Sequence, residues 1–109
     1  MNYYFIAHIR INDLEEYQKY INKSGAVFAK YKGEYLSVDN DATLLEGKYD
    51  YTRTVMIKFN SKSDFEDWYY SDEYQAILKH RLNAADCNTM LIQGIWKPEL
   101  IIVNTSKGI

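Results

Sequence analysis

Proline and cysteine are almost absent from this sequence, which holds one of each among its 109 residues. A lone cysteine excludes an intrachain disulfide framework, and an unpaired thiol without a recognisable signal peptide leads us to expect a cytoplasmic protein. No apolar run approaches the roughly 18 residues that cross a bilayer, so we expect no membrane association. Lysine plus arginine (13) nearly balances aspartate plus glutamate (15). Without a basic surplus, nucleic-acid binding is not expected.

Tyrosine, by contrast, is abundant, with 11 copies, and aromatic residues make up 16% of a chain that is 47% hydrophobic. This content excludes intrinsic disorder, and the length leaves room for one compact domain. A domain of this size has a modest core, so association with another chain is one way to bury the surplus aromatic surface.

Alternation of apolar and polar residues predicts four strands, at residues 3–11, 34–38, 51–59 and 89–95. A further stretch, at 42–46, reads as extended. In the first strand the odd positions are apolar, whereas the even positions are mixed and become polar toward the end. One face of this strand is therefore core, and the other faces either solvent or a polar cavity.

Capping residues mark the predicted helices. Asp13 begins the first helix, which Gly25 bends or splits and Gly33 ends. Ser61 has capping-box spacing to the residue three positions on and begins a short second helix. Ser71 begins another helical piece directly after it.

The resulting order, β-α-β-β-α-β, predicts an α+β fold of the ferredoxin-like type, with an antiparallel sheet and helices on one face. Because the strands carry apolar residues on both alternations, we expect a second copy to pack sheet to sheet as a homodimer. We assign residues 1–95 to this single domain and residues 96–109 to a C-terminal extension. Residues 99–104 of the extension could form a strand that pairs within the subunit or across the dimer, followed by a frayed end.

Several blocks within residues 3–95 resemble the DUF1330 family, small proteins of unknown function within the dimeric α+β barrel superfamily. The most specific block runs from Trp68 to Gln75, and others are Gly33-Glu34-Tyr35-Leu36, Arg53, Arg81 and Gly94. The chain departs from the family in reading Lys32-Gly33 instead of Gly-Gly, and in extending further beyond Gly94. The resemblance implies two ferredoxin-like units joined by their sheets, each with a cavity between sheet and helices. It implies no reaction.

Arg53 and Arg81 are the sharpest candidates for ligand binding. Lysine outnumbers arginine ten to three, yet two of the three arginines fall on family-motif positions. Because arginine presents a bidentate fork to carboxylates, which lysine cannot copy, the pair is interpreted as an anion clamp. The alternative is a structural ion pair, for example with Glu46 or Asp86.

Glu46 and His8 are the candidates for proton transfer. Glu46 follows two leucines, and partial desolvation would raise its pKa, whereas pairing with Arg53 would lower it. His8 lies on the more polar face of the first strand and could titrate near neutral pH, although a lone histidine there is often a satisfied polar residue. No spacing of histidine, cysteine and carboxylate residues predicts a metal site, and we expect no cofactor.

Trp68, Tyr69 and Tyr74 are the candidates for lining a pocket for a flat apolar ligand, with the tyrosine hydroxyls orienting it. The alternative is that they pack in the core and at the dimer interface. The stretch around Trp68 also looks like that of the haem-degrading monooxygenases. Their helix histidine is absent, because Leu78 occupies that position and His80 lies two residues later.

Two functions therefore remain open. The first is a cofactor-independent enzyme that acts on a small acidic or aromatic molecule in the barrel cavity. The second is a non-catalytic module that binds a small ligand or a partner through the same cavity. A haem-degrading activity is the less favoured third reading.

Overall fold

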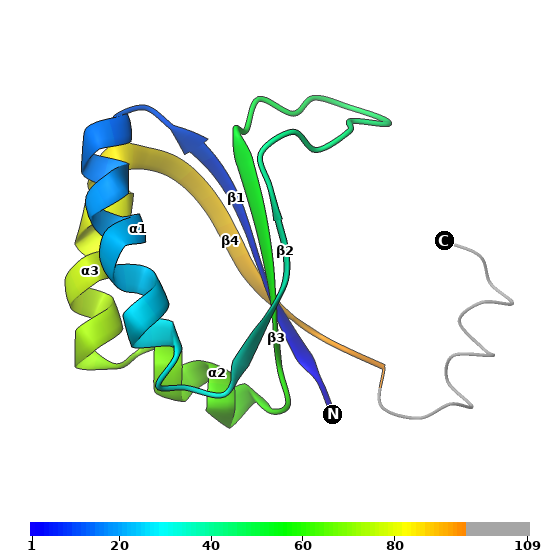
Figure 1. Cartoon of the computed structure of the whole chain (residues 1–109). Coiled ribbons are helices and arrows are strands. Elements are labelled where there is room, and N and C mark those ends of the chain that lie inside the picture. The colour runs from blue at the N-terminus through cyan, green and yellow to red at the C-terminus, as the bar shows by residue number, and fades with distance from the viewer. Residues whose placement is uncertain (96–109) are drawn as a thin grey trace, which may run out of the picture.

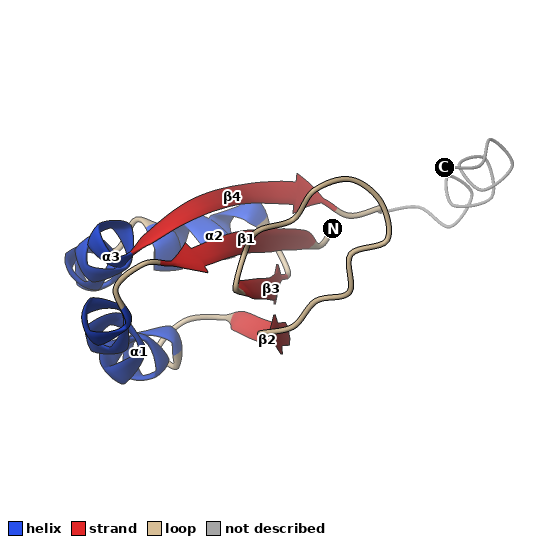
Figure 2. Cartoon of the chain, turned by 90° about the horizontal axis from the view of Figure 1, so that it is seen from above, coloured by secondary structure: helices blue, strands red, loops and turns tan. Residues whose placement is uncertain are grey.

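The computed structural model describes residues 1–95. Four antiparallel strands form one sheet in the order β2-β3-β1-β4, and three helices cover one of its faces (Figures 1 and 2). The elements are β1 (Tyr3–Ile11), α1 (Leu14–Phe28), β2 (Gly33–Asp39), β3 (Arg53–Phe59), α2 (Lys62–Tyr69), α3 (Asp72–Ala84) and β4 (Ala85–Gln93). The predicted α+β, ferredoxin-like fold is confirmed. None of the helices in this part of the chain is long and apolar enough to cross a membrane. The predicted strand at 99–104 lies outside the described residues.

Alternation along β1 divides the sheet into two faces. Phe5, Ala7 and Ile9 are buried under the helices, and they pair in register with residues of β3 and β4 on either side. The even residues of β1 lie on the opposite face, which no helix of residues 1–95 covers (Figure 1).

Side-chain caps fix where the helices begin, as the sequence predicts. Asp13 accepts a hydrogen bond from the backbone N–H of Glu16 at 3.1 Å, and Ser61 and Ser71 cap α2 and α3 in the same way. Of the two alternatives for Gly25, the split of the first helix is wrong, because α1 continues through this residue. A glycine costs a helix about 0.5–1 kcal/mol, and the burial of Tyr17 and other residues on one face of α1 outweighs that cost.

Several further boundaries differ from the predictions. The first helix ends at Phe28, and Gly33 instead opens β2. A Cβ at Gly33 would lie 2.5 Å from the Phe28 ring, so the glycine is needed for this close approach. Residues 42–46 form no strand. β4 begins at Ala85, four residues early, because Ala85 pairs with Ile11 of β1. Tertiary pairing thus extends a strand whose first residues have little strand propensity.

Candidate functional site

Arg53 and Arg81 come together at one cavity between the sheet and the helices. Arg53 is the first residue of β3, and Arg81 lies in the last turn of α3. The cavity has a volume of about 70 Å³. Its remaining walls come from β1, α1, β2, β3 and α2, and they include Tyr17, Tyr20, Tyr35 and Trp68.

Only one nitrogen of the Arg53 guanidinium has a hydrogen-bond partner within residues 1–95. Arg53 pairs in the sheet with Ile9 of β1, and its Nη1 donates a hydrogen bond to Oδ1 of Asn40 at 2.9 Å. Its Nε is buried and has no hydrogen-bond partner within residues 1–95. One terminal N–H group of this guanidinium is therefore satisfied, whereas the buried Nε–H is not.

Arg81 is the one charged residue that is buried within the described chain, with 2% of its surface exposed. Its guanidinium carbon lies 5.6 Å from the centre of the Tyr20 ring, a cation–π contact. The Tyr20 and Tyr74 hydroxyls share a hydrogen bond of 2.8 Å. Burial lowers the pKa of Arg81, but interaction with Tyr74 and Tyr20 raises it by more, so the residue stays charged. Its Nη1 has no hydrogen-bond partner among the residues that the structure describes.

Trp68 contributes a third buried donor. Its indole is 2% exposed and packs 4.3 Å, centre to centre, from the Tyr74 ring. Ser71, the cap of α3, donates a hydrogen bond to the Trp68 carbonyl at 2.8 Å, which fixes the junction between α2 and α3. Nε1 of Trp68 is buried without a partner in residues 1–95. Buried donors of this kind cost about 1–3 kcal/mol each when unsatisfied.

The cavity is electropositive. None of its lining residues is acidic, and neither Arg53 nor Arg81 forms an ion pair within the described chain. Asp86, one expected partner, instead accepts hydrogen bonds from Arg10 at 2.6 Å and Asn12 at 3.1 Å. Burial raises the pKa of Tyr17, and the positive charges of Arg53 and Arg81 offset part of that rise.

Glu46 and His8 lie away from this cavity. Glu46 is exposed in the segment between β2 and β3 and is not part of the cavity wall. His8 lies on the uncovered face of the sheet, where its Nδ1 is 3.3 Å from Oγ1 of Thr54. The rings of Tyr49 and Tyr51 contact it there. The structure therefore does not bring either proton-transfer candidate together with the arginines.

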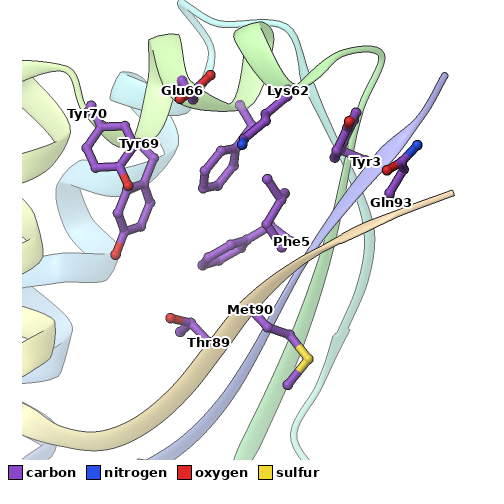
Figure 3. A pocket seen from close by; sticks show the side chains of 11 residues that line it. Tyr3, Phe5, Lys62, Glu66, Tyr69, Tyr70, Thr89, Met90 and Gln93 are labelled. Carbon is purple, nitrogen blue, oxygen red and sulfur yellow. The ribbon is translucent and has the colours of Figure 1, made fainter.

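The three aromatic candidates lie in different places. Trp68 lines the arginine cavity, and Tyr74 packs behind it without lining it. Tyr69 lines a second, more open pocket of about 570 Å³ between α2, β1 and β4 (Figure 3).

No group of three or more histidine, cysteine or acidic residues in residues 1–95 has metal-binding geometry.

Sequence reasoning did not assign Tyr20 and Tyr35 to the site. Tyr20 carries the cation–π contact to Arg81, and Tyr35 lines the cavity from β2 while remaining 46% exposed. The spacing of Tyr17 and Tyr20, three residues apart on α1, indicates that they share a face. It does not show that this face meets an arginine.

Comparison with known proteins places the chain in a family. No curated protein matches it. It is similar in structure to RPA0582, a protein of unknown function from Rhodopseudomonas palustris, with a TM-score of 0.72 and 19% identity over 88% of this chain and 84% of that chain. A dimeric ferredoxin-like protein of unknown function from Thermobifida fusca gives a TM-score of 0.63 and 18% identity, covering 86% and 92%.

SnoaB, a cofactor-independent oxygenase from Streptomyces nogalater, gives a TM-score of 0.62 and 11% identity, covering 89% and 96%. At such identities the structural likenesses show the fold alone. The model of a domain of unknown function, DUF1330, matches residues 2–95. The resemblance expected from the sequence is thus confirmed, and the chain belongs to the DUF1330 family.

Proposed function

We propose that this protein binds a small carboxylate in the cavity that Arg53, Arg81 and Trp68 line. One observation carries the proposal: three residues that line the same cavity, two of them cations, each have a buried N–H donor without a partner in residues 1–95. Buried polar groups in proteins are nearly always paired, and an unpaired buried charge is costlier still. An anion in the cavity would satisfy all three donors and neutralise part of the charge.

A carboxylate fits the donors and the space. Guanidinium groups bind carboxylates through short, charge-assisted hydrogen bonds, and an indole N–H can donate a further one. The cavity volume of about 70 Å³ corresponds to roughly two water molecules at about 30 Å³ each. That space suits a carboxylate with one or two carbons, and the half-exposed Tyr35 lines its wall from β2.

Binding without proton transfer is the better supported of the two functions. A general base must lie within hydrogen-bond reach of the substrate, and Glu46 and His8 lie elsewhere. The tyrosines that line the cavity are unsuited to act as bases at neutral pH, because burial raises the pKa of Tyr17, Tyr20 and Tyr35. An enzymatic role, as the fold of SnoaB would allow by analogy, has no such residue in its favour.

Calorimetric titration with acetate tests the proposal. We expect saturable binding of acetate and none of acetamide, which has the same shape without the charge. Arg81→Lys keeps the charge but loses the fork, so acetate should bind about tenfold more weakly, the effect of losing one charge-assisted hydrogen bond. Arg10→Lys, on the uncovered sheet face, is the matched control and should not change the affinity. Equal binding of acetate and acetamide, or an unchanged affinity in Arg81→Lys, would overturn the proposal.

We also propose that the protein is a homodimer whose subunits pack through the uncovered face of the sheet. Ile6, Met56, Met90 and Ile92 place apolar side chains on that face, and Met90 and Ile92 are 48% and 43% exposed. Contiguous apolar surface of this kind marks interaction sites, and dimeric proteins of the same fold support a second copy as the partner.

Sedimentation velocity tests the dimer. We expect Met90→Glu to shift the protein toward monomer at micromolar concentration, because it places a charge in the interface. Leu82→Glu is the matched control, since Leu82 is 59% exposed on α3, away from the sheet face. A well-behaved monomer for the unmodified chain would refute the proposal.

A further inference from the structure

The open pocket between α2 and β4 has a different chemistry from the arginine cavity, and we infer that it is a second binding site, for a planar, uncharged aromatic molecule that carries a hydroxyl group. Its volume of about 570 Å³ lies within the range of about 300–1,000 Å³ that is usual for small-molecule sites. The inference does not depend on the proposed carboxylate site.

The pocket exists because the helices leave the end of β4 uncovered. Thr89, Leu91 and Gln93 alternate on the helix-facing side of β4, where they pair with Ala7, Phe5 and Tyr3 of β1. Thr89 and Gln93 nevertheless remain exposed. The short helix α2 packs mainly against β1, β3 and α3, so the pocket remains open between α2 and the last part of β4.

One wall of the pocket is a stack of rings. Phe65 and Tyr69 of α2 lie 5.2 Å apart, centre to centre, with an angle of 20° between their planes. Phe5 continues the stack, 5.7 Å from Phe65 and inclined by 29°. Figure 3 shows the Phe5 and Tyr69 side chains directed toward the hollow. Offset stacks of this geometry are favourable between aromatic rings, and a flat ligand would extend this one.

The polar groups of the pocket favour a ligand without net charge. Lys62 and Glu66, one turn apart on α2, are both part of the lining, so their charges oppose each other there. No arginine lines this pocket. On β4, the exposed Thr89 presents its hydroxyl toward the hollow (Figure 3). A threonine hydroxyl can both donate and accept, which matches a ligand hydroxyl.

Phe5 separates the two sites. It lines both of them, and its ring lies 5.5 Å from Trp68 on one side and 5.9 Å from Tyr69. The arginine cavity offers cations to an anion, whereas the open pocket offers ring faces, hydroxyl groups and the opposed charges of Lys62 and Glu66. Two ligands of different chemistry would therefore bind next to each other without sharing a polar contact.

Titration of the full chain with 2-naphthol, followed by ¹H–¹⁵N NMR, tests the inference. We expect saturable shifts at the amides of Thr89, Leu91 and Tyr69. Thr89→Val should weaken binding about fivefold, the effect of one hydrogen bond. Thr89→Trp fills the hollow at an exposed strand position, so it should abolish binding while the spectrum stays that of a folded protein. Ile92→Leu, on the other face of β4 and outside the pocket lining, is the matched control and should bind as the unmodified chain does.

Several results would overturn the inference. These are an absence of shifts up to the solubility of 2-naphthol, shifts that map outside the pocket, or unchanged binding in Thr89→Trp. Equal affinity for 2-naphthoate would refute the preference for an uncharged ligand. Acetate shows whether the two sites are independent, because acetate bound in the arginine cavity should not displace 2-naphthol. If acetate fails to bind, the proposed carboxylate site is refuted and the inference about this pocket stands.

Discussion

Replacing Arg81 by methionine should make the protein without ligand more stable. Methionine fills a similar unbranched volume and removes the charge. Burying an ion costs several kcal/mol, and here two features offset part of that cost. The cation–π contact with Tyr20 contributes about 1–2 kcal/mol, and the position of Arg81 in the last turn of α3 contributes about 0.3–1 kcal/mol through the helix dipole. The remainder, about 1–2 kcal/mol, is the expected gain in the free energy of unfolding for Arg81→Met.

Urea denaturation at one fixed protein concentration measures this gain. With an m-value of about 2 kcal/mol/M, the midpoint should rise by about 0.5–1 M, with m unchanged. Acetate should raise the midpoint of the unmodified protein and leave that of Arg81→Met unchanged, since only a ligand that binds the native state stabilises it. A destabilisation of about 3–5 kcal/mol would refute the reasoning, because that is the effect of breaking a buried ion pair. Arg10→Met, at an exposed arginine with two carboxylate partners, is the control and should move the midpoint little.

Three further predictions concern the scaffold. Gly33→Ala should destabilise by about 1–3 kcal/mol, because its Cβ would lie within 2.8 Å of two phenylalanine rings, whereas Gly25→Ala, with no atom within 4 Å, should stabilise by about 0.5–1 kcal/mol in urea denaturation. The hydrogen bond from His80 lowers the pKa of Glu16 below its ordinary value of 4.5. Its contribution is therefore present above pH 4.5 and is lost as the pH falls through the lowered pKa. Glu16→Gln should accordingly reduce the loss of stability on acidification below pH 4.5, measured by thermal unfolding. Ser71→Ala should cost about 1 kcal/mol and Ser71→Asn little, since asparagine can still cap α3; equal losses in calorimetry would contradict a capping role.

Much of the fold follows from local sequence patterns, and its exceptions have tertiary causes. Alternation in residues 3–11 and the caps at Asp13, Ser61 and Ser71 predict elements that the structure confirms. The start of β4 at Ala85 could not be predicted, since pairing with β1 imposes it. Similarly, Gly25 predicts a break that burial on one face of α1 prevents.

The face of a strand is harder to predict than the strand. Alternation shows that His8 and Ile9 of β1 lie on opposite faces, but apolar residues occur on both. The more polar face looked equally compatible with a cavity or with solvent. In the structure the cavity lies under the helices, on the side of Ile9, and His8 is on the uncovered face. The alternation along one strand does not show which face of the sheet the helices cover. It therefore could not distinguish a cavity on the side of His8 from one on the side of Ile9.

The distribution of carboxylates among the arginines is the last feature that the sequence leaves open, and it bears most on function. Fifteen acidic residues are available to three arginines, so each arginine could have a partner. Instead, exposed Arg10 bonds to both Asp50 and Asp86, where ion pairs contribute little to stability. Buried Arg81 has no acidic partner within residues 1–95, where one would matter most. A buried cation without a partner destabilises the fold, and natural proteins carry such local costs mainly at functional sites. Arg81 remains in the cavity without an acidic partner from residues 1–95. An anionic ligand that serves as its counterion explains this arrangement.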